Sequence, residues 1–303
     1  MLSHRWLTGA AALAVLALPA CATARPHPPG GAALAVVAAE NVWGSLAEQL
    51  GGDHVTVTSV ISNPDADPHD YEPTAADGRA IARAGLVIVN GIGYDAWAGK
   101  LVDANPSSGR TVLDVGDLVH VPEGGNPHQW YSPAAVRTVS GEITAAYQRL
   151  DPGNAGYYDG RRATVLGTNL KPYFDTITEI RSTYAGTPVG ASESVFTPLA
   201  AALGLRLLTP DRFLNAISEG TDPTAADKAT VDRQIRTRQI AVYVYNSQNA
   251  TPDVRKQVDA AKSAGIPVVG ITETLTPAGT SFQDWQVAQL DALRKALARG
   301  AGR

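Results

Sequence analysis

Short β-branched runs alternate with longer amphipathic segments from Leu34 onward. The runs at 34–40, 54–61, 86–91 and 110–116 are rich in β-branched and other apolar residues, and Gly, Asn or Asp bounds each of them. Such runs are typical of strands that are buried on both faces. The segments between them repeat apolar residues at helical spacing. Alternation of this kind predicts an α/β fold with a mainly parallel sheet covered by helices.

The helices of this first half have recognisable ends. We predict one helix over 41–51, with Asn41 as its cap and a closing glycine. A second begins after Thr74, whose hydroxyl suits a cap. A third covers 94–104.

A helical pattern then replaces the alternation over 132–186. It is interrupted at 151–153 and at Pro172, which predicts a helix that ends near Leu150 and a longer one that crosses to the second half. The second half alternates again, with strands expected at 187–192, 205–208, 240–246 and 266–271 and helices through Ala202, from Thr224, from Pro252 and over 282–298.

The predicted architecture is therefore two α/β lobes joined by a long, rigid linking helix. The expected boundaries are a signal peptide at 1–20, a flexible tether at 21–33, an N-terminal lobe at 34–150, the linking helix at 151–186 and a C-terminal lobe at 187–303.

The composition agrees with a globular protein that does not bind nucleic acid. The chain has 303 residues, of which 44 % are hydrophobic, so it is long enough to bury large cores. Its formal net charge is -4, and its basic residues are scattered rather than clustered.

The N-terminus has the layout of an export signal. One positive charge, Arg5, precedes an apolar run that ends just before Cys21, the single cysteine of the chain. An uncleaved membrane anchor remains an alternative. "LPAC" resembles the bacterial lipobox, in which the cysteine is lipidated, although Cys21 could also be an ordinary small residue near a cleavage site. Lipidation would hold the protein on the outer face of the cytoplasmic membrane; without it, the periplasm is the expected location.

Imidazole and carboxylate side chains follow the predicted strands of both halves. His69 and His128 follow strands of the first half, and Glu193 and Glu273 follow strands of the second. Ligands of α/β proteins bind beyond the carboxyl ends of parallel strands. Two neutral imidazoles and two carboxylates suit a divalent transition-metal ion.

Each of these residues also has a structural interpretation. A histidine in a loop is often solvated, Glu193 could cap a helix, and Glu273 could face solvent. His54 opens a predicted strand and His120 lies in an apolar run, so we expect both to be structural.

Three motifs extend the case beyond single residues. "HDYEPTAAD" followed by "AGLVIVNGIGYDAWAGKL", then "NPHQWYSPAAV" and "DPGNAGYYDGRRA", resemble segments of the bacterial solute-binding proteins that serve zinc and manganese ABC importers, known as family 9. The resemblance runs from about Val36 to the C-terminus and is weaker in the second half.

The resemblance implies one metal site in the cleft between the lobes. His69 and His128 match the N-lobe ligands of the family. Glu193 stands where zinc-binding members usually carry a histidine, and Glu273 stands where the family usually has an aspartate. Asn246 takes the place of a frequent acid and is expected to support the ligands rather than bind. The partners implied are an ABC permease and its ATPase subunit, and we expect a monomer.

Ligand chemistry favours Mn²⁺ over Zn²⁺ by a narrow margin. Carboxylates that bind through both oxygens give the five or six contacts that suit Mn²⁺, whereas single-oxygen binding gives the four of Zn²⁺. The affinity order favours Zn²⁺, but the histidine-rich loop of many zinc-importing members is absent, since 118–126 contains only His120.

Two other functions stay open at this stage. An exported metal-dependent hydrolase would use the same ligands with one open position, although no HExxH, nucleophile elbow or phosphate loop accompanies them. A surface adhesin lipoprotein would hold the metal as a structural ion. We expect no catalytic residues.

Overall fold

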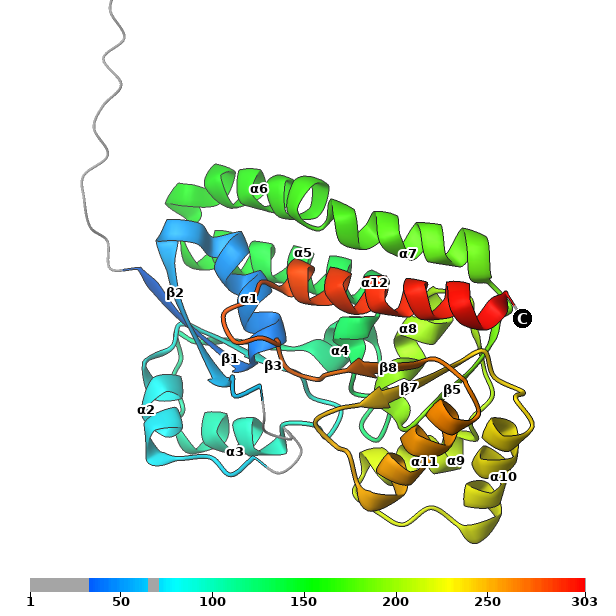
Figure 1. The fold of residues 1–303 in the computed structure, drawn as a ribbon. Helices are drawn as coiled ribbons and strands as arrows, with labels where there is room; N and C mark the ends of the chain where they lie inside the picture. Colours follow the sequence, from blue (N-terminus) through cyan, green and yellow to red (C-terminus); the bar gives the residue numbers. More distant parts are fainter. Residues whose placement is uncertain (1–32, 65–70, 303) are drawn as a thin grey trace, which may run out of the picture. The chain divides into compact units, whose positions relative to one another are not determined.

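The computed structural model describes residues 33–64 and 71–302 (Figure 1). His69 and Cys21 therefore lie outside the described residues. From Ala33 onward the chain forms one compact unit. None of the described helices is long and apolar enough to cross a membrane.

Two parallel sheets of four strands confirm the predicted fold class. Their strand orders are β2-β1-β3-β4 and β6-β5-β7-β8, so the same arrangement occurs in both halves. In each sheet the strand order reverses between the two central strands, and ligands of such sheets bind beyond the carboxyl ends of the strands at this point. The strands are β1 (Leu34–Glu40), β2 (Val55–Ile61), β3 (Leu86–Val89), β4 (Thr111–Asp114), β5 (Pro188–Ala191), β6 (Arg206–Leu207), β7 (Val242–Asn246) and β8 (Val268–Ile271).

Helices of the first half follow their sequence signals with one exception at a cap. Thr74 caps α2 and forms a capping box with Asp77, as its hydroxyl predicts. The predicted cap Asn41 is wrong: Glu40 holds the cap position, and Asn41 Oδ1 instead accepts a hydrogen bond from the Leu275 amide. The helices are α1 (Asn41–Gly51), α2 (Ala75–Arg83), α3 (Ala96–Ala104), α4 (Val115–Val119) and α5 (Pro133–Leu150).

The strand predicted at 110–116 is shorter than expected. Asp114 accepts a hydrogen bond from the Asp117 amide and starts α4, so Val115 and Gly116 are helical. His120, expected in an apolar run, is exposed and ends α4 in a left-handed conformation with φ 58°.

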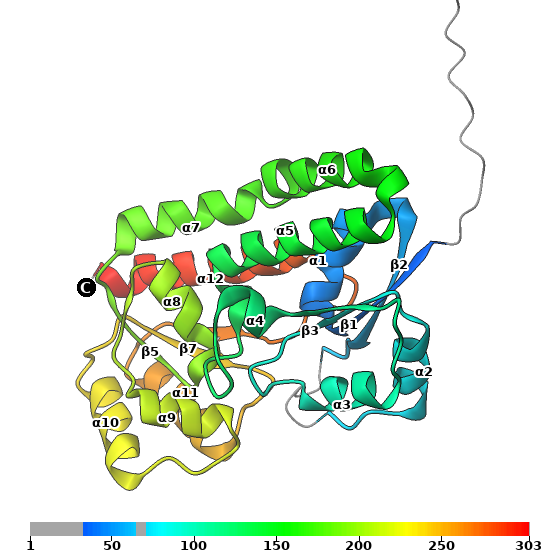
Figure 2. The same ribbon diagram turned by 180° about the vertical axis from the view of Figure 1, so that it is seen from behind.

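A helical segment leads from the first sheet to the second. It consists of α6 (Ala155–Thr164), a π-helical turn over Val165–Asn169 and α7 (Lys171–Tyr184). Figures 1 and 2 show α6 and α7, in green, lying over α5 and α12.

The second half contains one helix that the sequence pattern missed. α9 (Asp211–Ser218) begins at Pro210 with no side-chain cap, and it has only eight residues, so its signal is weak. The other helices are α8 (Thr197–Ala202), α10 (Ala225–Arg236), α11 (Pro252–Ser263) and α12 (Phe282–Ala301).

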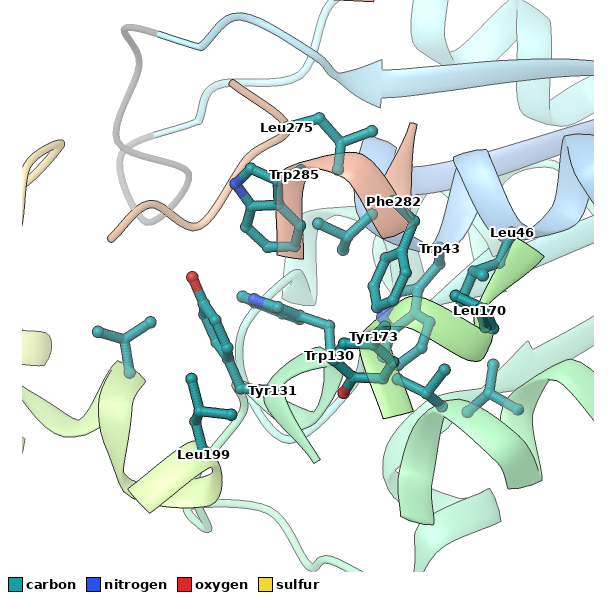
Figure 3. Close-up of a cluster of buried hydrophobic side chains, with 14 of the residues drawn as sticks. Trp43, Leu46, Trp130, Tyr131, Leu170, Tyr173, Leu199, Leu275, Phe282 and Trp285 are labelled. Carbon is teal, nitrogen blue, oxygen red and sulfur yellow. The ribbon is translucent and has the colours of Figure 1, made fainter. Parts of the chain in front are cut away.

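One aromatic core joins both halves. Figure 3 shows Trp43 of α1, Trp130, Tyr173 of α7, and Phe282 and Trp285 of α12 gathered in a single cluster. The rings of Trp43 and Trp130 meet edge to face at 6.4 Å between centroids, and those of Phe282 and Trp285 at 5.9 Å. The sheets are therefore held by shared packing as well as by covalent connection.

Candidate metal-binding site

His128 lies in the core with a defined ring orientation. It precedes the 3-10 helix η3 (Gln129–Tyr131) and has 0 % of its surface exposed. Asn126 Oδ1 accepts a hydrogen bond from the His128 amide at 3.0 Å and lies 2.9 Å from Nδ1. Because this oxygen is an acceptor, Nδ1 carries the proton, and Nε2 is the nitrogen suited to bind a metal.

Glu273 meets that nitrogen from the other half of the chain. It follows β8 and is 1 % exposed, and its Oε2 lies 3.3 Å from His128 Nε2. Donors that are about 2.0–2.2 Å from one ion lie about 2.8–3.6 Å apart, for octahedral to tetrahedral angles. The spacing of the two groups therefore fits adjacent ligands of one ion.

Glu193 is a second buried carboxylate at a strand exit of the C-terminal sheet. It follows β5, is 1 % exposed, and accepts a hydrogen bond from Asn249 Nδ2 at 3.1 Å through Oε2. Although it stands before the 3-10 helix η6 (Ser194–Phe196), its side chain makes no capping hydrogen bond.

The segment Asn246–Asn249, here called the amide segment, contacts both carboxylates. Asn246 Nδ2 donates to Glu273 Oε1 at 2.6 Å. Gln248 Oε1 accepts from the amide of Glu273 at 2.5 Å, and its Nε2 donates to the Pro64 carbonyl at 2.8 Å. Among the described residues, the amide segment thus supplies Glu273 with neutral donors and acceptors.

The described residues contain only part of the predicted ligand set. Within 33–64 and 71–302, no group of three or more His, Cys, Asp or Glu side chains is arranged to hold a metal ion. The structure brings His128 and Glu273 together and buries Glu193 at the same sheet edge as Glu273. The place of His69 is not described.

Of the two other histidines considered, His54 has structural surroundings. The His54 ring stacks on Tyr157 with centroids 4.3 Å apart, and its Nδ1 lies 3.7 Å from Asp151 Oδ2. His120 is exposed.

Several residues of the site escaped the sequence reasoning. The Tyr94 hydroxyl donates to Glu273 Oε2 at 2.7 Å. Asn126, Gln248 and Asn249 orient the predicted ligands or the backbone beside them. Gly91 and Gly93, just before Tyr94, were the available signal, because they mark a turn at a strand exit.

Another pair of buried carboxyl groups lies at the carboxyl edge of the N-terminal sheet. Glu40 ends β1 and is 1 % exposed, and neither oxygen has a hydrogen-bond partner by geometry among the described residues. Burial, followed by the nearby charge of Asp95, raises the pKa of Glu40 well above its usual value. Asp95 accepts hydrogen bonds from the amides of Asn90 and Gly91, while burial raises its pKa.

A cavity of about 580 Å³ adjoins the site. Tyr94 and Asn126, which contact Glu273 and His128, contribute to its wall, together with the acids Glu123, Asp211 and Glu219. The negative side chains favour the approach of a cation to this side of the site.

Comparison with known proteins places the chain in a family. The family model "Zinc-uptake complex component A periplasmic" matches residues 36–296, so the chain belongs to that family of solute-binding proteins.

Curated relatives include proteins named for either metal. The manganese ABC transporter substrate-binding lipoprotein PsaA of Streptococcus mitis is 25 % identical over 317 aligned positions, which cover 95 % of this chain and 96 % of PsaA. The zinc-binding lipoprotein AdcA of Streptococcus pneumoniae is 24 % identical over 275 positions, which cover 82 % of this chain and 52 % of AdcA.

Solved structures share the fold. The periplasmic zinc binding protein TroA from Treponema pallidum superposes with a TM-score of 0.75 at 18 % identity, over 88 % of this chain and 100 % of TroA. The Mn-bound S38A periplasmic metal binding protein from Candidatus Liberibacter asiaticus gives 0.74 at 20 % identity, over 86 % of this chain and 98 % of that one.

Proposed function

We propose that the protein is the extracytoplasmic substrate-binding component of an ABC importer, which captures a divalent transition-metal ion and delivers it to a membrane permease. The observation that carries this proposal is the 3.3 Å approach of His128 Nε2 to Glu273 Oε2, fully buried and supplied by both halves of the chain. The family match and the names of the relatives agree with it.

The proposed ligands are His69, His128, Glu193 and Glu273. His69 is included on its sequence motif alone. The contacts of Asn246 and Asn249 support the two glutamates as a matched pair, since each carboxylate accepts a hydrogen bond from one side-chain amide. Neutral supporting groups leave the negative charge of the carboxylates available to the ion.

The proposed cargo is Mn²⁺, with Zn²⁺ close behind. Two carboxylates and no thiolate give an oxygen-rich donor set, and relatives named for manganese and for zinc both match the chain.

A binding role explains the site better than the two alternatives. A hydrolase needs an open ligand position and a general base, and no sequence motif supplies them. An adhesin with a structural ion would not need to exchange it. The family is one of solute-binding proteins.

The rest of the proposal concerns location and partners. After export, Cys21 would carry a lipid that tethers a monomer to the outer face of the cytoplasmic membrane. There it would meet a permease with its ATPase subunit, as the ABC-transporter names of the relatives indicate.

Metal analysis of the purified chain, followed by competitive Mn²⁺ and Zn²⁺ titration, tests this function. An ion that binds only the folded state raises stability by about 2.7 kcal/mol at a hundredfold excess over Kd. If the melting temperature of chelator-treated protein did not change on addition of Mn²⁺ or of Zn²⁺, the proposal would be contradicted. Bound metal that chelator cannot remove would instead favour the adhesin.

A further inference from the structure

Tyr94 is an N-lobe residue whose hydroxyl reaches a proposed ligand of the other lobe. It is 7 % exposed and donates a hydrogen bond to Glu273 Oε2 at 2.7 Å. Its ring packs edge to face against Trp130 and His128, with centroids 5.3 and 5.9 Å apart. Neighbouring rings therefore fix the direction of the hydroxyl.

The loop that carries Tyr94 has an unusual backbone. Gly91, Ile92 and Gly93 have φ values of 68°, 60° and 86° in succession. A positive φ is costly for a β-branched residue such as Ile92 and persists where the surrounding structure enforces it. The Asp95 carboxylate does so by accepting hydrogen bonds from the amides of Asn90 and Gly91 at 2.7 and 2.8 Å.

The carboxylate of Glu273 is oriented from two sides. The Tyr94 hydroxyl donates a hydrogen bond to Oε2, which lies 3.3 Å from His128 Nε2. Asn246 Nδ2 donates a hydrogen bond to Oε1 at 2.6 Å. Oε2 therefore faces the proposed ion position, while Oε1 is directed toward the amide segment.

We propose that Tyr94 is a positioning residue that, together with Asn246, holds the Glu273 carboxylate so that it binds the ion through Oε2 alone, and that this restriction limits the number of protein contacts to the ion. The inference rests on the proposed function. With two imidazole nitrogens and one oxygen of Glu273, the ion has four protein contacts if Glu193 uses one oxygen and five if it uses both. Six contacts from protein atoms alone, which would favour Mn²⁺ most, are then excluded.

Competitive Mn²⁺/Zn²⁺ titration and the visible absorption of bound Co²⁺ test this inference on the full chain. Tyr94→Phe removes the donor to Oε2, and Asn246→Leu removes the donor to Oε1. Each variant should shift the ratio of the two Kd values toward Mn²⁺ by about tenfold. This is the smallest change in metal affinity usually seen when a metal ligand loses the side chain that supports it. Each should also weaken the Co²⁺ d–d bands, as expected when the coordination number rises.

The matched control is Tyr147→Phe. It removes a buried hydroxyl that donates to the Ala47 carbonyl at 2.9 Å, away from the proposed ligands, and should keep the wild-type ratio and spectrum. Thermal unfolding of the metal-free variants identifies those that fold.

The outcomes separate this inference from the proposed function. A folded Tyr94→Phe protein with the wild-type ratio and spectrum overturns the inference alone. If Tyr94→Phe does not fold, a wild-type ratio and spectrum for Asn246→Leu overturns it equally. Wild-type protein that binds neither ion overturns the proposed function and this inference together.

Discussion

Gln248 Nε2, in the C-terminal half, donates a hydrogen bond to the carbonyl of Pro64, in the N-terminal half, at 2.8 Å. The same amide nitrogen also donates to Thr274 Oγ1 at 2.6 Å, and Gln248 Oε1 accepts from the amides of Glu273 and Thr274. One neutral side chain thus links the backbone of a proposed ligand to the loop that leaves β2.

Gln248→Ala should lower the free energy of unfolding by about 1–3 kcal/mol, because it leaves partly buried backbone amides without their acceptor. Urea unfolding of the metal-free protein measures the change. Gln239→Ala, at an exposed position, is the control and should stay within about 0.5 kcal/mol of wild type. Equal effects of the two substitutions would contradict the linking role.

His128→Ala should abolish most of the stabilisation that Mn²⁺ or Zn²⁺ confers, because it removes the buried imidazole that faces Glu273 and is proposed as a ligand. Differential scanning calorimetry with and without metal measures the loss. His120→Ala removes an exposed imidazole and should retain the full shift. A His128→Ala protein that is stabilised as strongly as wild type would exclude His128 from the site.

Glu193→His should move the preference toward Zn²⁺ by about tenfold or more in the ratio of Kd values, because a third imidazole replaces a carboxylate that can bind through two oxygens. Competitive titration gives the ratio. An unchanged ratio would show that Glu193 does not determine selectivity.

Glu40→Gln should stabilise the metal-free protein near neutral pH. Since the folded-state pKa of Glu40 is raised above its value of about 4.5 in the unfolded chain, its contribution to stability is complete below that pH and is lost as pH rises through the folded pKa. A glutamine at this position cannot ionise, so the variant should not lose stability as pH rises. Its free energy of unfolding should exceed that of wild type by on the order of 1–3 kcal/mol at neutral pH, and the difference should disappear toward pH 4.

Unfolding curves between pH 4 and pH 8 provide this comparison for Glu40→Gln. Glu48→Gln, on the exposed face of α1, should follow the wild-type profile. A gain that is independent of pH would show that Glu40 does not titrate in this range.

Local signals predicted those parts of the fold that local chemistry determines. α1 occupies the predicted range, and Thr74 caps α2 through its hydroxyl. Asn41 was assigned the cap of α1, but a contact with Leu275, far along the chain, uses its side chain instead. Val115 and Gly116 look like the end of a strand, yet the Asp114 cap makes them helical.

In the candidate site, too, the sequence predicted some residues, and tertiary contacts determine the others. A histidine and a glutamate at strand exits indicated that His128 and Glu273 could meet, and they do. Tyr94 and Asn249 carry no comparable signal, because a tyrosine or an asparagine in a loop has many uses. Their roles depend on tertiary neighbours that periodicity does not reveal.

The aromatic cluster of Trp43, Trp130, Tyr173, Phe282 and Trp285 limits how an ion can leave. Wide separation of the sheets would expose these rings to water, and each 200 Å² of apolar surface so exposed would cost about 5 kcal/mol. Spontaneous escape through such a motion would be slow. Release of an ion to the proposed transporter would therefore involve movement of individual ligand-bearing loops rather than separation of the two sheets.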